Sequence, residues 1–246
     1  MNIVLQQKLP DDMHAARGLP GAAPVQGPWL HVDEAYAGQM ALRCQLLSDR
    51  RLDVLAELPG SGPAVEELRE MVFAELPALG FTRRGQGWLC PDGRIVPDGT
   101  GLETLGRVCQ ADFCVLQKPD GADEHVMTAA VLCFPASWRL GEKIGHPLRA
   151  IHAPVAEYDD ALARRVQRLF DGVQPGRALW RFNRLWYQDA ALFQPRSETE
   201  PRPVGSGRAP YLRSERQVVM RLPKTQAAVF VIHTYVVAAA DVPALR

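Results

Sequence analysis

Two apolar segments near the end of the sequence, separated by a short turn, restrict the fold more than any other feature. Residues 211–222 (YLRSERQVVMRL) alternate between two parities, which is typical of a strand with two unlike faces. The apolar parity holds Leu212, Val218, Met220 and Leu222, with Ser214 and Arg216 as exceptions, and the polar parity holds Arg213, Glu215, Gln217 and Arg221. Residues 227–237 (AAVFVIHTYVV) are apolar on both parities, as in a central strand. The connecting turn at 222–225 (LPKT) predicts an antiparallel pair.

Helical and strand-like segments precede this pair. A helix is expected at 61–76, where Pro77 ends the apolar stripe, and another at 157–172, where Asp159 and Asp160 favour the first turn and Gly172 is expected just past the end. Strands are expected at 108–117, 126–134 and 180–186, and residues 34–47 predict a short helix that runs into a strand. The pattern predicts an α+β fold, an antiparallel sheet flanked by helices.

The first 28 residues are rich in Gly, Pro and Ala and show no periodicity, so they predict a flexible arm. The remaining residues, 29–246, have the length of a single domain.

Composition excludes several classes of function. Lys plus Arg and Asp plus Glu both number 28, so bulk charge does not favour binding to nucleic acid or to an anionic membrane. No apolar run reaches the roughly 20 residues of a membrane span, and the N-terminus lacks a secretory pattern. Five scattered cysteines do not form a disulfide framework or a zinc motif. A cytoplasmic protein is expected.

Common catalytic signatures, such as a Walker loop, G-x-G-x-x-G, H-E-x-x-H and G-x-S-x-G, are absent. Among the histidines, His152 lies between a predicted strand and a predicted helix, where it is either a structural histidine or a metal ligand. His233 lies within the apolar strand and is either a hydrogen-bonded core residue or part of a pocket wall.

The polar parity of residues 211–222 also has two interpretations. It is either a solvated face with cross-strand ion pairs or the floor of a pocket that holds a carboxylate through bidentate arginine contacts.

At these residues the sequence resembles a known family. The string CFPASWRLGEKIGHPLRAIHAPV (133–155), followed in order by YLRSERQVVMRLPKT (211–225) and AAVFVIHTYV (227–236), is similar to the haem-dependent oxidative N-demethylases, in their haem-carrying subunit. The resemblance extends over roughly residues 28–240.

The resemblance implies a PAS-like fold with a b-type haem, on which O₂ is activated with electrons from NADPH. A separate reductase partner with flavin and an iron–sulfur cluster delivers these electrons. A small methylated secondary amine would be hydroxylated on its methyl group and would release formaldehyde. A homo-oligomer is also compatible with the sequence.

Residue by residue, the resemblance implies that His152 is the axial iron ligand. Arg213 or Arg216 would pair with a haem propionate, and Glu215 would hold a cationic amine or relay protons. Lys224 and Thr225, in the matching turn, are either cofactor contacts or ordinary hairpin residues. His233 stands where the family usually has Arg, which makes it a second candidate iron ligand.

Two other functions remain compatible with the sequence. One is a non-enzymatic haem-binding or gas-sensing module, because PAS folds commonly act as sensors. The other is a scaffold that has lost its haem.

Overall fold

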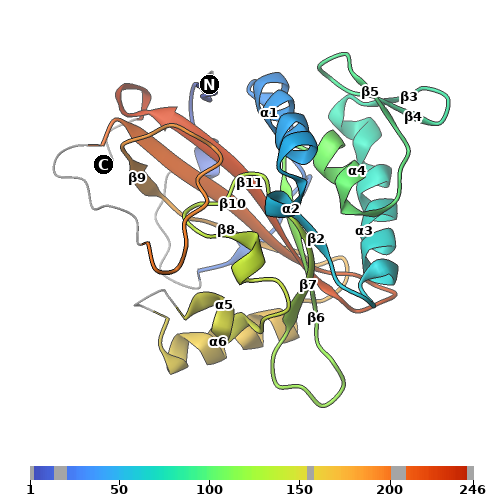
Figure 1. Cartoon of the computed structure of the whole chain (residues 1–246), viewed down its shortest axis with the longest axis vertical. Coiled ribbons are helices and arrows are strands. Elements are labelled where there is room, and N and C mark those ends of the chain that lie inside the picture. The colour runs from blue at the N-terminus through green and yellow to red at the C-terminus, as the bar shows by residue number, and fades with distance from the viewer. Residues whose placement is uncertain (1–2, 14–20, 154–157, 201–208, 243–246) are drawn as a thin grey trace.

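The computed structural model describes residues 3–13, 21–153, 158–200 and 209–242, and its centre is one eight-stranded antiparallel sheet (Figure 1). The strand order is β1-β8-β10-β11-β6-β7-β2, and β9 also pairs with β10. The strands are β1 (Ala23–Pro24), β2 (Leu55–Glu57), β6 (Asp112–Gln117), β7 (Val126–Val131), β8 (Leu179–Phe182), β9 (Leu185–Tyr187), β10 (Tyr211–Arg221) and β11 (Ala228–Ala238). This arrangement confirms the α+β prediction.

The predicted antiparallel hairpin is present. β10 and β11 pair along their whole length, from Tyr211 opposite Ala238 to Arg221 opposite Ala228. β11 lies between β10 and β6, so the segment that is apolar on both parities is indeed a central strand.

Six helices surround the sheet in the described residues. They are α1 (Tyr36–Asp49), α2 (Arg51–Val54), α3 (Gly62–Glu75), α4 (Gly101–Val108), α5 (Leu148–His152) and α6 (Asp160–Gly172). A small sheet of β3 (Thr82–Arg83), β4 (Gly87–Leu89) and β5 (Ile95–Pro97) lies beside α4.

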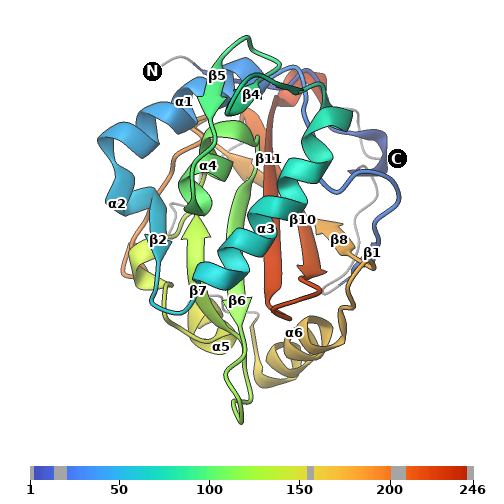
Figure 2. The same cartoon turned by 90° about the vertical axis from the view of Figure 1, so that its right-hand side faces the viewer.

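The two parities of β10 face two different layers. The side that carries Leu212, Val218 and Met220, here called the α3 face, packs in one apolar cluster with α1, α3 and α4. Figure 2 shows α3 crossing in front of β10 and β11. The other side, here called the α6 face, carries Val219 and packs with α5 and α6 in a second, smaller cluster. The sheet thus separates two environments.

Several helix predictions need correction. Residues 36–49 form one helix, α1, and do not turn into a strand. α4 was not predicted from the sequence. α6 begins at Asp160, later than the predicted start at residue 157, and Asp159 just before it accepts a hydrogen bond from the Leu162 amide. Gly172, however, is the last helical residue, so it does not serve as the residue beyond the end.

Parts of the predicted N-terminal arm pack against the sheet. Leu9 and Met13 are buried in the larger apolar cluster. The Gln6 amide bonds to the Thr234 carbonyl and accepts from the Val236 amide. β1 adds an edge strand to β8. These contacts are made by isolated apolar side chains and by one side-chain amide. Because they follow no periodic pattern, the composition of the segment could not predict them.

The structure describes no helix long and apolar enough to cross a membrane. All five cysteines are free thiols, and four of them are buried.

Candidate functional site

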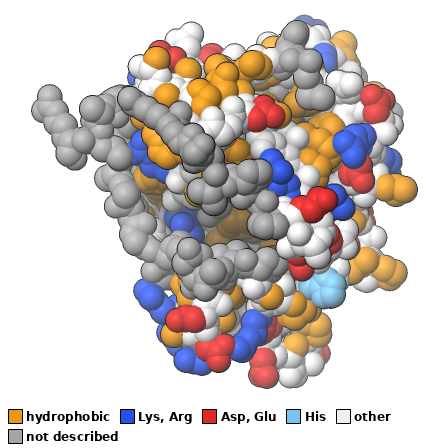
Figure 3. Space-filling view, turned by 60° about the vertical axis from the view of Figure 1, so that its left-hand side comes forward, with side chains coloured by type: hydrophobic (Ala, Val, Ile, Leu, Met, Phe, Trp, Pro, Cys, Tyr) orange, Lys and Arg blue, Asp and Glu red, His pale blue; other side chains and the backbone are white. Residues whose placement is uncertain are grey.

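The α6 face holds an apolar recess. Its smaller cluster is bordered by partly buried apolar side chains from the sheet and from the helical side: Ala56, Trp138, Ile144, Ile151, Val166, Leu169, Leu179 and Phe230. Figure 3 shows a hollow with apolar side chains at its floor. Their partial exposure leaves apolar surface on this face that a ligand with an apolar body could cover.

His152 ends α5 on this side of the sheet, with one ring nitrogen already engaged. Its Nδ1 lies 2.8 Å from the Leu148 carbonyl oxygen. A carbonyl only accepts, so Nδ1 carries the proton and Nε2 keeps its lone pair. The ring stacks on Tyr158 at 4.4 Å between centroids. This is the tautomer that a metal-ligating histidine requires.

Burial, and to a smaller degree the charge of Lys143, lowers the pKa of His152 despite the hydrogen bond from its ring to Leu148. The imidazole is therefore neutral at neutral pH and free to donate an electron pair to a metal.

Lys143, which sequence reasoning did not single out, supports the end of α5. Its buried ammonium donates to the Ile151 carbonyl at 2.5 Å and pairs with Glu198. The lysine thus fixes the backbone next to His152. Its place in the EK pair of the motif was the only available signal.

Glu215 is buried on the same face and is held by neighbouring amides. Its carboxylate accepts from Asn183 Nδ2 at 2.9 Å and from Gln217 Nε2 at 3.0 Å, and its backbone amide donates to Asn183 Oδ1 at 2.8 Å. Arg213 lies 3.8 Å away. These hydrogen bonds fix the Glu215 carboxylate in place. Thr234, which is opposite Glu215 on β11, has a buried hydroxyl with no partner among the described residues.

Arg213 anchors loops. It donates to the carbonyls of Leu192 at 2.9 Å and Phe134 at 2.6 Å, which leaves only its buried Nε without a partner in the described chain. Because Arg213 and Glu215 are buried, the interpretation of this parity as a solvated face is wrong.

Arg181 on β8 was missed by sequence reasoning. It lies opposite Gln217, on the same face as Glu215, and is half-buried. The alternation of WRFN at 180–183 could have placed it there, but the irregular spacing around it weakened that signal.

Arg216 and His233 lie on the other side of the sheet. They are directly opposite each other in the hairpin, on the α3 face. Arg216 donates to the Trp29 carbonyl and lies over the Trp180 ring. His233 Nε2 bonds to Asp33 at 2.9 Å. One planar ligand on the α6 face cannot also contact these two residues.

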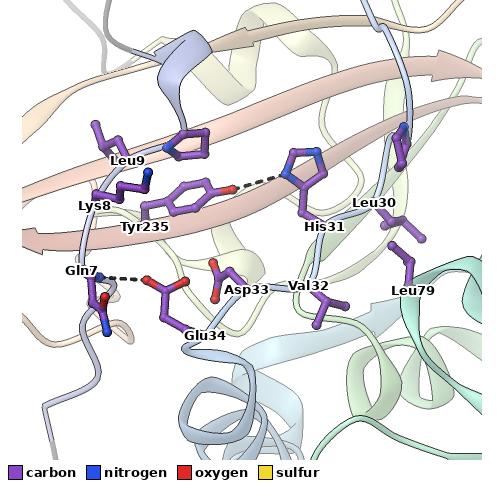
Figure 4. A pocket seen from close by; sticks show the side chains of 12 residues that line it. Gln7, Lys8, Leu9, Leu30, His31, Val32, Asp33, Glu34, Leu79 and Tyr235 are labelled. Carbon is purple, nitrogen blue, oxygen red and sulfur yellow. Dashed lines mark hydrogen bonds between the residues drawn. The ribbon is translucent and has the colours of Figure 1, made fainter.

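A separate cavity of about 500 Å³ lies next to His233 on the α3 face (Figure 4). His31, Asp33 and Tyr235 line it, and the Tyr235 hydroxyl lies 3.3 Å from His31 Nδ1. Burial lowers the pKa of His31 to about 4. Burial alone would raise the pKa of Asp33, but hydrogen bonds, first from His233 and then from two glutamines, lower it to about 2. The carboxylate is thus already saturated with donors.

Lys224 and Thr225 are in the hairpin turn, which binds α3. The backbone amides of both residues and the Thr225 hydroxyl donate to Glu67, and Lys224 pairs with Glu70. These contacts attach the turn to α3. The structure does not bring Lys224 and Thr225 together with His152.

The residues of the α6 face fit a haem. Among the described residues, no three His, Cys, Asp or Glu side chains lie close enough to hold a bare metal ion. A porphyrin supplies four nitrogens itself and needs an apolar slot, one axial donor and cations at its edge. The recess could provide the apolar slot, His152 Nε2 the axial donor and Arg181 a cation. In addition, Arg213 Nε and Thr234 Oγ1 are buried polar atoms without a hydrogen-bond partner among the described residues.

The fold and this face thus define an α+β protein whose central sheet carries an apolar recess bordered by a histidine and by arginines. Comparison with protein families gives a more specific answer: residues 24–244 match the family described as haem-dependent oxidative N-demethylase, alpha subunit-like. The chain belongs to this family, whose name implies enzyme activity, a haem and at least one further subunit.

Proposed function

We propose that the chain is the haem-carrying component of an oxidative N-demethylase that acts on a small methylated secondary amine. Haem b would bind in the recess of the α6 face, within a PAS-like fold, with His152 as its axial ligand. The observation that carries the proposal is the tautomer of His152, whose Nδ1 is fixed by a carbonyl, in a chain of this family. A cytoplasmic location and homo-oligomers remain predictions.

The overall reaction is balanced with one O₂ and one reduced nicotinamide. A methylated amine, O₂, NADPH and a proton give the demethylated amine, formaldehyde, NADP⁺ and water. When bound, the haem supplies the O₂ chemistry. Electrons come from a separate NADPH-dependent reductase with flavin and an iron–sulfur cluster.

The protein's own residues would position the reactants. The neutral His152 imidazole would donate its Nε2 electron pair to the haem iron, and the apolar side chains of the recess would exclude water. The fixed Glu215 carboxylate attracts the secondary ammonium or moves a proton from it, since Asn183 and Gln217 keep it oriented. Arg213, bound to two carbonyls, holds the surrounding loops.

The test has two stages. Absorption spectra before and after addition of haemin should show a Soret band. The loaded protein, driven by hydrogen peroxide in place of O₂ and NADPH, should then release formaldehyde from members of a panel of N-methylamines, and Glu215→Gln should slow this release. A protein that never develops a Soret band contradicts haem binding. A haem-loaded protein that demethylates no amine, with peroxide or with a reductase, is a non-enzymatic haem module.

A further inference from the structure

Arg181 is a half-buried cation without a counter-charge in contact. It forms no hydrogen bond or ion pair with any residue that the structure describes. The other cations that point into this side of the sheet are engaged: Arg213 by two carbonyls, Arg221 by the Phe170, Val173 and Gln226 carbonyls, and Lys143 by Glu198. Arg181 is thus an exception on its own face.

The surroundings of Arg181 disfavour its charge. Burial lowers the pKa of its guanidinium, and only the more distant Glu215 opposes this effect. Arginine nevertheless stays protonated in proteins, so the charge is carried at a cost. A carboxylate from a ligand would pair with this charge and offset part of the cost of its burial.

The position suits an acidic ligand with an apolar body. Arg181 lies between the apolar border of the recess, at Leu179, and the polar group of Glu215 and Asn183. β8 is near the sheet edge, because β1 pairs only with Leu179 and Trp180. A ligand buried by its apolar part would therefore present a carboxylate to Arg181 at the more open side.

We propose that Arg181 is the carboxylate receptor of the α6 face and that it binds a propionate of the haem. The assignment rests on the proposed function and replaces Arg216, which points to the opposite face. The planar guanidinium fork matches a carboxylate in a bidentate contact.

The test compares haemin with haemin dimethyl ester, in which both propionates are esterified. Affinity is measured by Soret titration for the wild type, Arg181→Leu and Arg181→Lys. Arg177→Leu is the matched control, because Arg177 is an exposed arginine four residues earlier. Unfolding of the apo proteins in urea is measured in parallel.

The wild type and Arg177→Leu should bind haemin about tenfold more tightly than the ester, as expected for one charge-assisted contact. Arg181→Leu should lose this preference, and Arg181→Lys should keep part of it. Because Arg181 has no partner to lose, apo Arg181→Leu should be at least as stable as the wild type.

Two results would overturn the assignment while leaving the proposed function intact: Arg181→Leu keeps the preference for haemin, or apo Arg181→Leu is clearly destabilised, as for a structural arginine. If the wild type binds neither haemin nor its ester, both proposals fail.

Discussion

His152 and His233 are both largely buried histidines, but the central sheet places them on opposite sides. His152 ends a short helix beside an apolar recess, and its Nδ1 is held by a backbone carbonyl. His233 is in the middle of a strand, held by the Asp33 carboxylate and packed against the rings of Tyr235 and His31.

The difference lies in what surrounds the remaining ring nitrogen. His233 Nδ1 is buried without a partner in the described residues, and His233 is not among the residues that line the neighbouring cavity. His152 Nε2 forms no hydrogen bond with a described residue, and its helix borders the partly exposed apolar side chains of the α6 face. Burial and residue type are therefore insufficient to identify an iron ligand, and the surroundings of each histidine must be compared.

The largest effect on haem affinity is expected from substitution of His152, with the corresponding substitution of His233 as the comparison. His152→Gly should weaken haem binding at least about 100-fold, because the iron loses its protein ligand, and added imidazole should restore the Soret band. His233→Ala should retain haem affinity within about threefold, although Asp33 loses a hydrogen bond. If His233→Ala lost the Soret band and His152→Gly retained it, the haem would bind on the α3 face and not on the α6 face.

The α3 face should show a distinct dependence of stability on pH. The pKa of His31 is lowered to about 4 in the folded protein, below its ordinary value of 6.5. Between pH 4 and pH 6.5, His31 therefore binds a proton in the unfolded chain but stays neutral in the folded protein. Stability is full above pH 6.5 and should fall by about 2–3 kcal/mol as the pH decreases to 4.

Urea unfolding of the apo protein from pH 7.5 to pH 4 measures this change. His31→Gln cannot titrate and should lose the His31 part of the slope below pH 6.5, while the part that comes from other buried histidines such as His152 remains. Its difference from the wild type should stay constant above pH 7. An unchanged slope in the variant would show that other groups cause the acid sensitivity.

A third change tests whether the turn of the hairpin is structural. Glu67→Gln removes the charge that accepts two amides and one hydroxyl from Lys224 and Thr225. It should cost about 2 kcal/mol of unfolding free energy, since each charge-assisted bond contributes more than a neutral one. Haem affinity, measured by Soret titration, should not change. A large loss of affinity at equal folding would make this turn part of the cofactor site.

The smallest effect is expected from Lys224→Met. Its ammonium pairs with Glu70 at 2.8 Å, but both side chains are more than half exposed. Such an exposed pair adds little to stability, and the Lys224 backbone amide keeps its bond to Glu67. Calorimetry should therefore give nearly the wild-type melting temperature, and a drop of many degrees would point to an unrecognised contact of the ammonium.

The sequence predicted much of the sheet and a part of the site. The alternation in residues 211–222 gave β10, its neighbour and the grouping of Arg213 with Glu215, because strand side chains repeat every two residues. The motif indicated His152. It could not indicate Arg181 or Asn183, whose relevance comes from β8 pairing beside β10 through a contact more than thirty residues apart.

By itself, the sequence determined which side chains share a face, since the period of a strand is a local property of the backbone. It also determined that the chain carries the motifs of its family. Only the tertiary structure decided which layer each face meets, which ring nitrogen of His152 is occupied and which arginine of the α6 face has no partner among the described residues. These features depend on contacts between segments distant along the chain, and the local pattern of residues carries no information about such contacts.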